Sequence, residues 1–327
     1  MERGCENLLR LSFRDLVAMG NVSIPSIRYG LIPATITPMD ENYQVDYDQL
    51  EKYIDWISKF KLGGVAVNVD TSEGPHLNSE ERASIIKTYA RKVGRRFPIV
   101  AGLHARNTEE AVKLGKEAKD SGADGLLVFP HPAFMGEKAE EVVYAYHKEI
   151  AEKVGLPIVL FQLQPVLGGI EFGKEVLNRL VEIENVVAIK EASFDAKKFT
   201  ETVRILEKAP RKITILTGND NFIYESLVMG AEGGLLGFGT IAVEMQVEMF
   251  RLASEGRFKE SGEIWKELLP LEETIFSPPV RDYRARLKVA LKIMGIIDEA
   301  FVRPPLLQIT KNEEERIRTT LKSLRMI

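Results

Sequence analysis

The sequence has few features that would point to an extracellular, membrane or nucleic-acid-binding protein. One of its 327 residues is a cysteine, Cys5, so no disulfide can form within the chain, and we expect a cytoplasmic location. No stretch approaches the roughly 18 uninterrupted apolar residues of a membrane span. The 44 basic and 48 acidic residues are interspersed and give a net charge of −4. We therefore expect no nucleic-acid or membrane partner and predict a small-molecule substrate.

Several common catalytic motifs are also missing. The chain has no Gly-x-Ser-x-Gly turn, no P-loop and no His-x-His or His-Glu-x-x-His pair. The segment 1–28 carries Glu2, Glu6 and Asp15 and makes a poor secretory signal, so we interpret it as an N-terminal extension. Asp40, Glu41 and Asp70 offer the one weak alternative for a divalent ion. We predict neither a metal nor a cofactor.

From residue 30 onward, short runs rich in β-branched residues alternate with segments of helical period. Capping signals open two of the helical segments, at Asn78-Ser79-Glu80-Glu81 and at Asn107-Thr108-Glu109-Glu110. The strand-like runs are 30–37, 63–69, 97–103, 122–130, 156–162, 185–192, 212–218 and 230–238. The expected helices are 47–60, 79–93, 108–121, 139–153, 172–183, 197–208, 220–229 and 241–255.

Eight such units in a row predict a parallel sheet covered by helices, for which two architectures compete. An open doubly wound sheet usually has a Gly-rich turn after its first strand, but here that turn reads TPMDEN. The count of eight fits a closed α/β fold, the (β/α)8 TIM barrel. We predict an N-terminal extension over 1–28, the barrel over 29–256, and C-terminal helices packed on it over 257–327.

The strongest candidate for chemistry is a lysine at the end of the sixth strand. Residues 185–193 read NVVAIKEAS, and strand alternation places Ala188, Lys190 and Ala192 on one face. Active sites of such barrels lie at the carboxyl ends of the strands. A buried lysine there would have a lowered pKa, and its neutral amine could attack a ketone. The structural alternative is a lysine that reaches solvent at a strand end or pairs with a carboxylate.

These residues resemble those of a known family. Lys-Glu-Ala-Ser after the sixth strand, PATITP at 33–38 and LPIVLF at 156–161 resemble the pyruvate-dependent class I aldolases, the superfamily of dihydrodipicolinate synthase and N-acetylneuraminate lyase. The segment 70–77 is similar to that family's Gly-Thr-Thr-Gly-Glu-Ser-Pro-Thr-Leu loop. The resemblance covers about residues 30–310. It implies that Lys190 forms a Schiff base, that Glu73 holds its loop, and that the chain forms a homo-oligomer, a dimer or a tetramer.

The departures from the family pattern concern the substrate. Phe161 stands where the family has a tyrosine whose hydroxyl relays protons, and Val166 or a neighbour stands in place of an arginine that binds a second carboxylate. His131 is our first choice for a replacement proton relay, and His104 the second, because imidazole titrates near neutral pH. Each could equally be a histidine bound to a backbone carbonyl. We expect substrate binding by the set Asp70, Thr71, Ser72, Phe161 and Gly237.

The predicted function is a lyase or aldolase that acts on pyruvate or a related 2-oxo acid through Lys190. One alternative is a dehydratase or aldolase of 2-keto-3-deoxy sugar acids, since the iminium acidifies the adjacent carbon in every case. Another is a homologue that binds a metabolite without turnover, because Phe161 has lost the hydroxyl.

Overall fold

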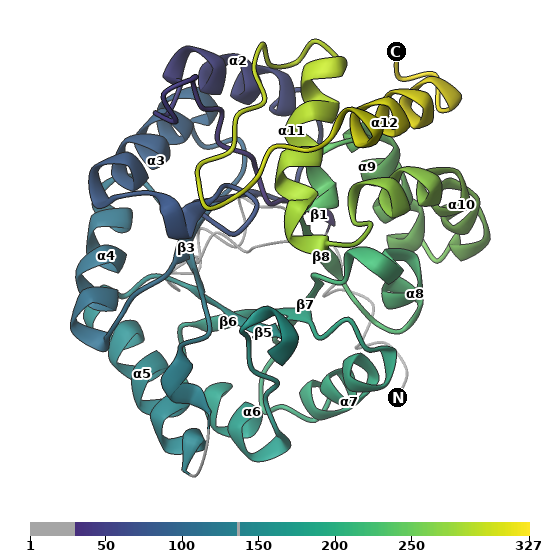
Figure 1. Ribbon diagram of the computed structural model, residues 1–327. Helices are drawn as coiled ribbons and strands as arrows, with labels where there is room; N and C mark the ends of the chain where they lie inside the picture. Colours follow the sequence, from purple (N-terminus) through teal and green to yellow (C-terminus); the bar gives the residue numbers. More distant parts are fainter. Residues whose placement is uncertain (1–29, 136–137) are drawn as a thin grey trace.

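The computed structural model describes residues 30–135 and 138–327, so the segment 1–28 lies outside the described residues. Eight parallel strands form a central ring with helices around it, which confirms the predicted (β/α)8 barrel (Figure 1). The strands are β1 (Gly30–Pro33), β2 (Val65–Val67), β3 (Ile99–Leu103), β4 (Gly125–Val128), β5 (Ile158–Leu163), β6 (Val186–Ala192), β7 (Thr214–Thr217) and β8 (Gly233–Leu236).

The strand order in the sheet is β1-β8-β7-β6-β5-β4-β3-β2, and the ring closes between β1 and β2. A parallel bridge joins Ala34 to Ala66 at this seam. The backbone N–H and the side-chain hydroxyl of Thr35 each donate to the carbonyl of Ala66, both at 2.9 Å. Closure removes the exposed edges that an open sheet would have. It also brings all eight carboxyl ends of the strands to one mouth.

The helices between strands begin where the sequence places capping residues. The side chain of Asn78 accepts from the N–H of Glu81 in a capping box, and that of Asn107 accepts from the N–H of Glu110. The α-helices are α2 (Tyr47–Ile57), α3 (Ser79–Val93), α4 (Thr108–Asp120), α5 (Ala139–Val154), α6 (Lys174–Leu180), α7 (Ala196–Leu206), α8 (Ile223–Val228), α9 (Val243–Ser254), α10 (Phe258–Ile275), α11 (Tyr283–Ile293) and α12 (Lys311–Ser323). Short 3₁₀ helices are η1 (Gly74–His76), η2 (Pro132–Phe134), η3 (Pro165–Leu167), η4 (Asp220–Phe222), η5 (Phe238–Thr240) and η6 (Val280–Asp282).

The apolar core is divided by the sheet. Inward-facing strand residues fill the barrel with small and branched side chains, which include Ala66, Val100, Leu127, Val159 and Leu235. The outward-facing strand residues pack against the helices in two larger clusters. Among the described residues, no helix combines the length and the apolar character needed to cross a membrane.

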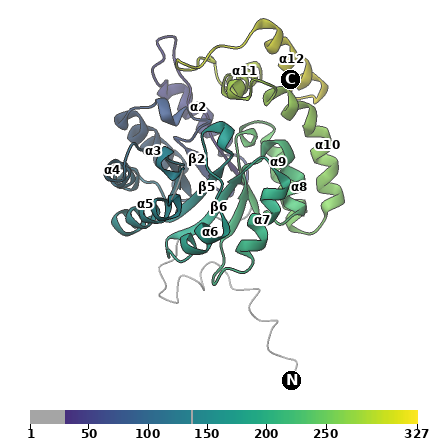
Figure 2. The same cartoon turned by 60° about the horizontal axis from the view of Figure 1, so that its bottom comes forward.

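The C-terminal helices α10, α11 and α12 follow the last barrel unit and lie together at one end of the molecule (Figure 2). Helix α11 packs against α12 and α10. Its Lys288 forms a buried ion pair with Glu73, which lies in the loop between β2 and α3 and has a left-handed backbone (φ 57°). Glu73 therefore holds the loop, as the resemblance implied. The boundaries predicted for the three regions stay a prediction.

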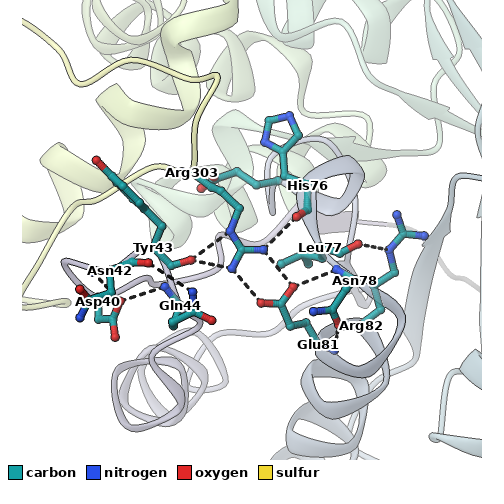
Figure 3. Close-up of polar contacts among 11 residues, drawn as sticks. Asp40, Asn42, Tyr43, Gln44, His76, Leu77, Asn78, Glu81, Arg82 and Arg303 are labelled. Carbon is teal, nitrogen blue, oxygen red and sulfur yellow. Dashed lines mark hydrogen bonds and ion pairs between the residues drawn. The ribbon is translucent and has the colours of Figure 1, made fainter.

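The residue Arg303, after α11, ties the chain to the same loop region. Its guanidinium lies between the carboxylate of Glu81 and two backbone carbonyls, those of Tyr43 and His76 (Figure 3). The distances are 2.7 Å to Glu81 Oε1, 2.8 Å to the carbonyl of His76 and 2.6 Å to that of Tyr43. A planar guanidinium suits this arrangement because its donors diverge in a fixed fork. The C-terminal segment thus fixes one side of the barrel mouth.

Candidate active site

Lys190 lies near the carboxyl end of β6, between Phe161 on β5 and Leu216 on β7. Its neighbours Ala188 and Ala192 belong to the cluster inside the barrel, whereas Ile189 packs outward against helices. The alternation predicted for this strand is therefore the one observed. The residues that flank the lysine on this face are therefore small.

The environment of Lys190 favours a neutral amine. The residue is 9% exposed, and burial lowers its pKa, although the charges of Asp220 and Asp70 raise it in part. Its Nζ lies 4.5 Å from the centre of the Phe161 ring. Among the described residues, no carboxylate lies within 4.0 Å of this nitrogen as an ion-pair partner. The amine is thus buried without an ion-pair partner among those residues.

Gly218, which follows β7, is the residue that makes room for the lysine. A Cβ at this position would lie 2.6 Å from Cε of Lys190 and 2.9 Å from Cβ of Ala192. Both distances are shorter than real Cβ contacts, so a larger residue would push the lysine from its position. The glycine therefore sets where the amine lies in the barrel mouth.

Two buried acids lie on the side of β7. Burial raises the pKa of Asp220 to about 6, against the opposing effects of the Phe238 N–H and the Lys190 charge. Burial, together with the charge of Asp220, raises the pKa of Glu272 on α10 to about 8. Phe238 N–H donates to Asp220 at 2.9 Å. Perturbed carboxyl groups of this kind are typical of functional sites.

Glu191, next to the lysine, points away from the barrel interior. Its carboxylate accepts from Nε2 of Gln162 at 2.7 Å and from Nδ2 of Asn219 at 2.7 Å. Gln162 also donates to the hydroxyl of Thr202 on α7 at 2.9 Å. These bonds place Glu191 between the sheet and the helices. Its role is structural, as the sequence indicated.

Asp70 lies opposite, in the loop after β2, and it is paired. Its carboxylate forms an ion pair with Arg284 and accepts a hydrogen bond from the hydroxyl of Tyr283 at 2.9 Å. Burial would raise the pKa of Asp70, but Arg284 and Tyr283 hold it below the usual value. The negative charge that would repel an anionic substrate is therefore largely offset.

Three of the predicted binding residues meet around Tyr283. The hydroxyl of Thr71 lies 3.0 Å from the Tyr283 hydroxyl. A Cβ at Gly237 would lie 3.1 Å from the Tyr283 ring and 3.3 Å from Oγ1 of Thr71, so the glycine keeps this space free. Ser72 Oγ instead accepts from the backbone N–H of Val69 at 3.3 Å, which fixes the loop. Asp70, Thr71 and Gly237 thus form one wall of the mouth.

Aromatic rings connect the two sides. Phe161 contacts Phe129 edge-on with centroids 4.9 Å apart, and Phe129 packs on His104 at 3.5 Å. Burial, together with the charge of the nearby Arg82, lowers the pKa of His104 to about 3. Near neutral pH this imidazole is uncharged and extends the apolar floor.

The structure places His131 differently. Its Nδ1 accepts from the N–H of Ala133 at 3.0 Å, and its Nε2 lies 2.9 Å from the carbonyl of Arg106. Its ring faces Phe134 and Tyr146 of the helix layer. Both nitrogens are therefore engaged with backbone groups. The structure does not join His131 to the group around Lys190, and its catalytic role stays a prediction.

Sequence reasoning missed Tyr283 and Arg284 as site residues. Both lie on α11, more than 200 residues beyond Asp70, and the rule that sites lie at strand ends cannot find a residue of the C-terminal helices. One signal was available. The segment 283–293 carries Arg284, Arg286 and Lys288, and a helix that packs on a barrel must bury some of these charges with partners.

Comparisons with known proteins agree with this architecture. Residues 28–324 match the model of the Dihydrodipicolinate synthetase family. The 4-hydroxy-tetrahydrodipicolinate synthase of Neisseria meningitidis serogroup B is 30% identical over 295 residues, which cover 90% of this chain and 98% of that protein. A monomeric dihydrodipicolinate synthase variant superposes with a TM-score of 0.86 at 26% identity, covering 94% of this chain and all of that one.

A third relative was solved with a ligand. The dihydrodipicolinate synthase of Acinetobacter baumannii, in complex with pyruvate, has a TM-score of 0.81 and 29% identity, and the match covers 92% of this chain and all of that one. The predicted family, fold and lyase class are confirmed. The chain belongs to the dihydrodipicolinate synthetase family.

Proposed function

We propose that Lys190 is the Schiff-base residue of this lyase and that its substrate is pyruvate or a related 2-oxo acid. The observation that carries the proposal is a lysine buried at the carboxyl end of β6 with no ion-pair partner among the described residues. Desolvation makes its neutral form accessible, and the neutral amine is the nucleophile.

The loop after β2 is suited to hold the carboxylate of the 2-oxo acid. The backbone N–H groups of Thr71 and Ser72 donate to no acceptor among the described residues, and both residues are buried. Consecutive free N–H groups bind anions. The Asp70–Arg284 pair keeps the surroundings close to neutral. We infer that the carboxylate binds here and that the keto carbon points toward Lys190.

The chemistry then follows from the amine. Nζ adds to the keto carbon, the resulting carbinolamine loses water, and the iminium withdraws electrons from the adjacent carbon. A carbon–carbon bond can then form or break at that carbon. The apolar walls made by Phe161, Phe129 and Leu216 keep bulk water from the iminium.

A 2-keto-3-deoxy sugar acid is the second candidate substrate, and one observation favours it. Val166, at or beside the place of the family arginine, is 89% exposed in η3 and offers no charge to a second carboxylate. Arg284 is committed to Asp70. A polyhydroxy chain needs no such cation.

Borohydride reduction in the presence of pyruvate tests the role of Lys190. We expect the wild-type protein to gain the mass of one reduced adduct, located on Lys190 by peptide mapping. Lys190→Ala should lose the adduct completely. Lys212→Ala is the matched control, because Lys212 is an exposed lysine paired with Glu232, and its loss should change nothing. The absence of an adduct with every 2-oxo acid tested, in folded wild-type protein, would refute the proposal.

The further expectations of a dimer or tetramer and of a cytoplasmic location stay predictions. Family resemblance supports the oligomer. Light scattering coupled to size-exclusion chromatography measures the mass of the assembly directly, and a single species of monomer mass would contradict it.

A further inference from the structure

A directed chain of hydrogen bonds runs along one wall of the barrel mouth. The Tyr283 hydroxyl donates to Oδ2 of Asp70 at 2.9 Å and lies 3.0 Å from Oγ1 of Thr71. A phenol has only one proton, and here Asp70 receives it. At the other contact the tyrosine oxygen must therefore accept, and Thr71 must donate. The chain has a direction, from Thr71 through Tyr283 to Asp70.

The chain of hydrogen bonds lies at the same barrel mouth as Lys190. Lys190 lies on β6 and Asp70 in the loop after β2, both at the carboxyl ends of barrel strands. Against the lowering by burial, the charge of Asp70 also raises the pKa of Lys190 in part. Gly237 keeps space free beside the Tyr283 ring and the Thr71 hydroxyl. The Asp70 side chain is 40% exposed, so the far end of the chain reaches solvent. The near end, the Thr71 hydroxyl, lies in the loop that we assign to the substrate carboxylate.

Packing alone does not account for the Tyr283 hydroxyl. The ring stacks on Phe276 with centroids 4.9 Å apart and planes 16° apart, and a phenylalanine would keep this contact. Burial and the charge of Asp70 raise the pKa of Tyr283 well above its usual value, so the phenol keeps its proton near neutral pH. It can pass a proton only by receiving another, which is what the Thr71 contact allows.

We propose that Tyr283 provides the phenol hydroxyl that position 161 lacks, and that Thr71 and Tyr283 together relay the proton exchanged while Lys190 forms its Schiff base. This inference rests on the proposed function. It assigns a helix outside the eight barrel units, α11, to the active site.

The relay step balances as follows. The lone pair of Nζ forms the N–C bond, and the carbonyl π electrons move to oxygen. The nitrogen then carries an extra proton and the oxygen a negative charge. Thr71 accepts the proton from nitrogen as its own proton passes to Tyr283 and that of Tyr283 to Asp70. The reverse movement delivers a proton to the oxygen. A second proton, taken from a water molecule that becomes hydroxide, lets the carbinolamine hydroxyl leave as water while the nitrogen lone pair forms the C=N bond.

Timed borohydride trapping with pyruvate tests the relay. Tyr283→Phe should slow adduct formation at saturating pyruvate by about 10²–10⁴-fold, the range of general acid–base effects. The final adduct yield and the half-saturating pyruvate concentration should stay unchanged. Tyr53→Phe is the matched control, since Tyr53 is a fully buried tyrosine of α2 whose hydroxyl has no partner among the described residues. Its trapping rate should equal that of the wild type.

The outcomes separate the two proposals. Failure of the wild-type protein to trap any 2-oxo acid would refute the function of Lys190, whereas wild-type trapping with an unchanged rate in Tyr283→Phe would overturn the relay alone. Thr71→Val interrupts the same chain from the loop and must also slow trapping, even if Tyr283→Phe folds poorly. The double variant should be no slower than the slower single one, because both hydroxyls serve one path. Losses that add in free energy would overturn the relay.

Discussion

Two lysines are buried in the part of the chain that the structure describes, and they differ in what surrounds the nitrogen. Burial lowers the pKa of Lys190 on β6 and of Lys288 on α11 alike. Lys288 pairs with Glu73 and donates to the carbonyl of Phe301 at 2.7 Å. Lys190 faces the ring of Phe161 and has no ion-pair partner among the residues that the structure describes. The two lysines therefore share burial and differ in whether a partner meets the nitrogen.

The two surroundings follow from the elements that carry the lysines. Lys190 projects from a strand whose flanking inward residues are alanines, which carry no side-chain acceptor. Lys288 projects from a helix onto a loop whose left-handed Glu73 points its carboxylate inward. Glu73 has a further bond from the N–H of Arg303 at 2.7 Å. Lys288 joins the C-terminal helices to the loop after β2, whereas Lys190 is the lysine that we propose as the Schiff-base residue.

The largest effect on stability is expected when Lys288, the lysine of the buried ion pair, is replaced. Lys288→Met leaves the Glu73 carboxylate buried without its cation, which costs about 3–5 kcal/mol of the free energy of unfolding. Urea denaturation monitored by circular dichroism measures this loss. It should be accompanied by release of the loop after β2, because the pair joins that loop to α11.

The double variant Glu73→Gln with Lys288→Met provides the control. Removing both charges should recover part of the lost stability, since neither partner then remains buried and unpaired. A single variant with wild-type stability would show that the pair is not what holds α11 to the barrel.

The sequence predicted one of these two lysines and not the other, for a physical reason. Lys190 lies in a strand, where alternation and the strand-end rule both act over a few residues. Lys288 and its partner Glu73 are 215 residues apart in the sequence, and Tyr283 and its partner Asp70 are 213 residues apart. Such pairings depend on how α11 docks, which no local pattern encodes. The eight barrel units were predictable because each one repeats a local period.

A smaller effect on stability, of opposite sign, is expected when Lys190 is replaced. Lys190→Met should abolish trapping and raise the free energy of unfolding near neutral pH by about 0.5–2 kcal/mol, as is common where a site trades stability for activity. The folded pKa lies below the unfolded one, so the unfolded chain binds the extra proton between the two values. Wild-type stability therefore rises with pH across this window.

Comparison of the wild type with Lys190→Met isolates the contribution of the proton on Lys190. The advantage of Lys190→Met should be greatest below the folded pKa of Lys190 and should vanish as pH approaches the ordinary lysine value of 10.5. Urea denaturation of both proteins across this range measures it. An advantage that is independent of pH would mean that packing, and not the buried amine, causes the difference.

The smallest effect is expected at an exposed lysine that also contacts the C-terminal segment. Lys52 on α2 pairs with Asp298 at 3.0 Å, and the two side chains are 58% and 65% exposed. Water and salt screen such pairs, so Lys52→Met should change the free energy of unfolding far less than Lys288→Met does, and by less still at high salt. The N–H of Asp298 also donates to Gln49 at 3.0 Å, a bond that the variant keeps. A loss as large as that of Lys288→Met would mean that pairing with the C-terminal segment, rather than burial, carries the energy.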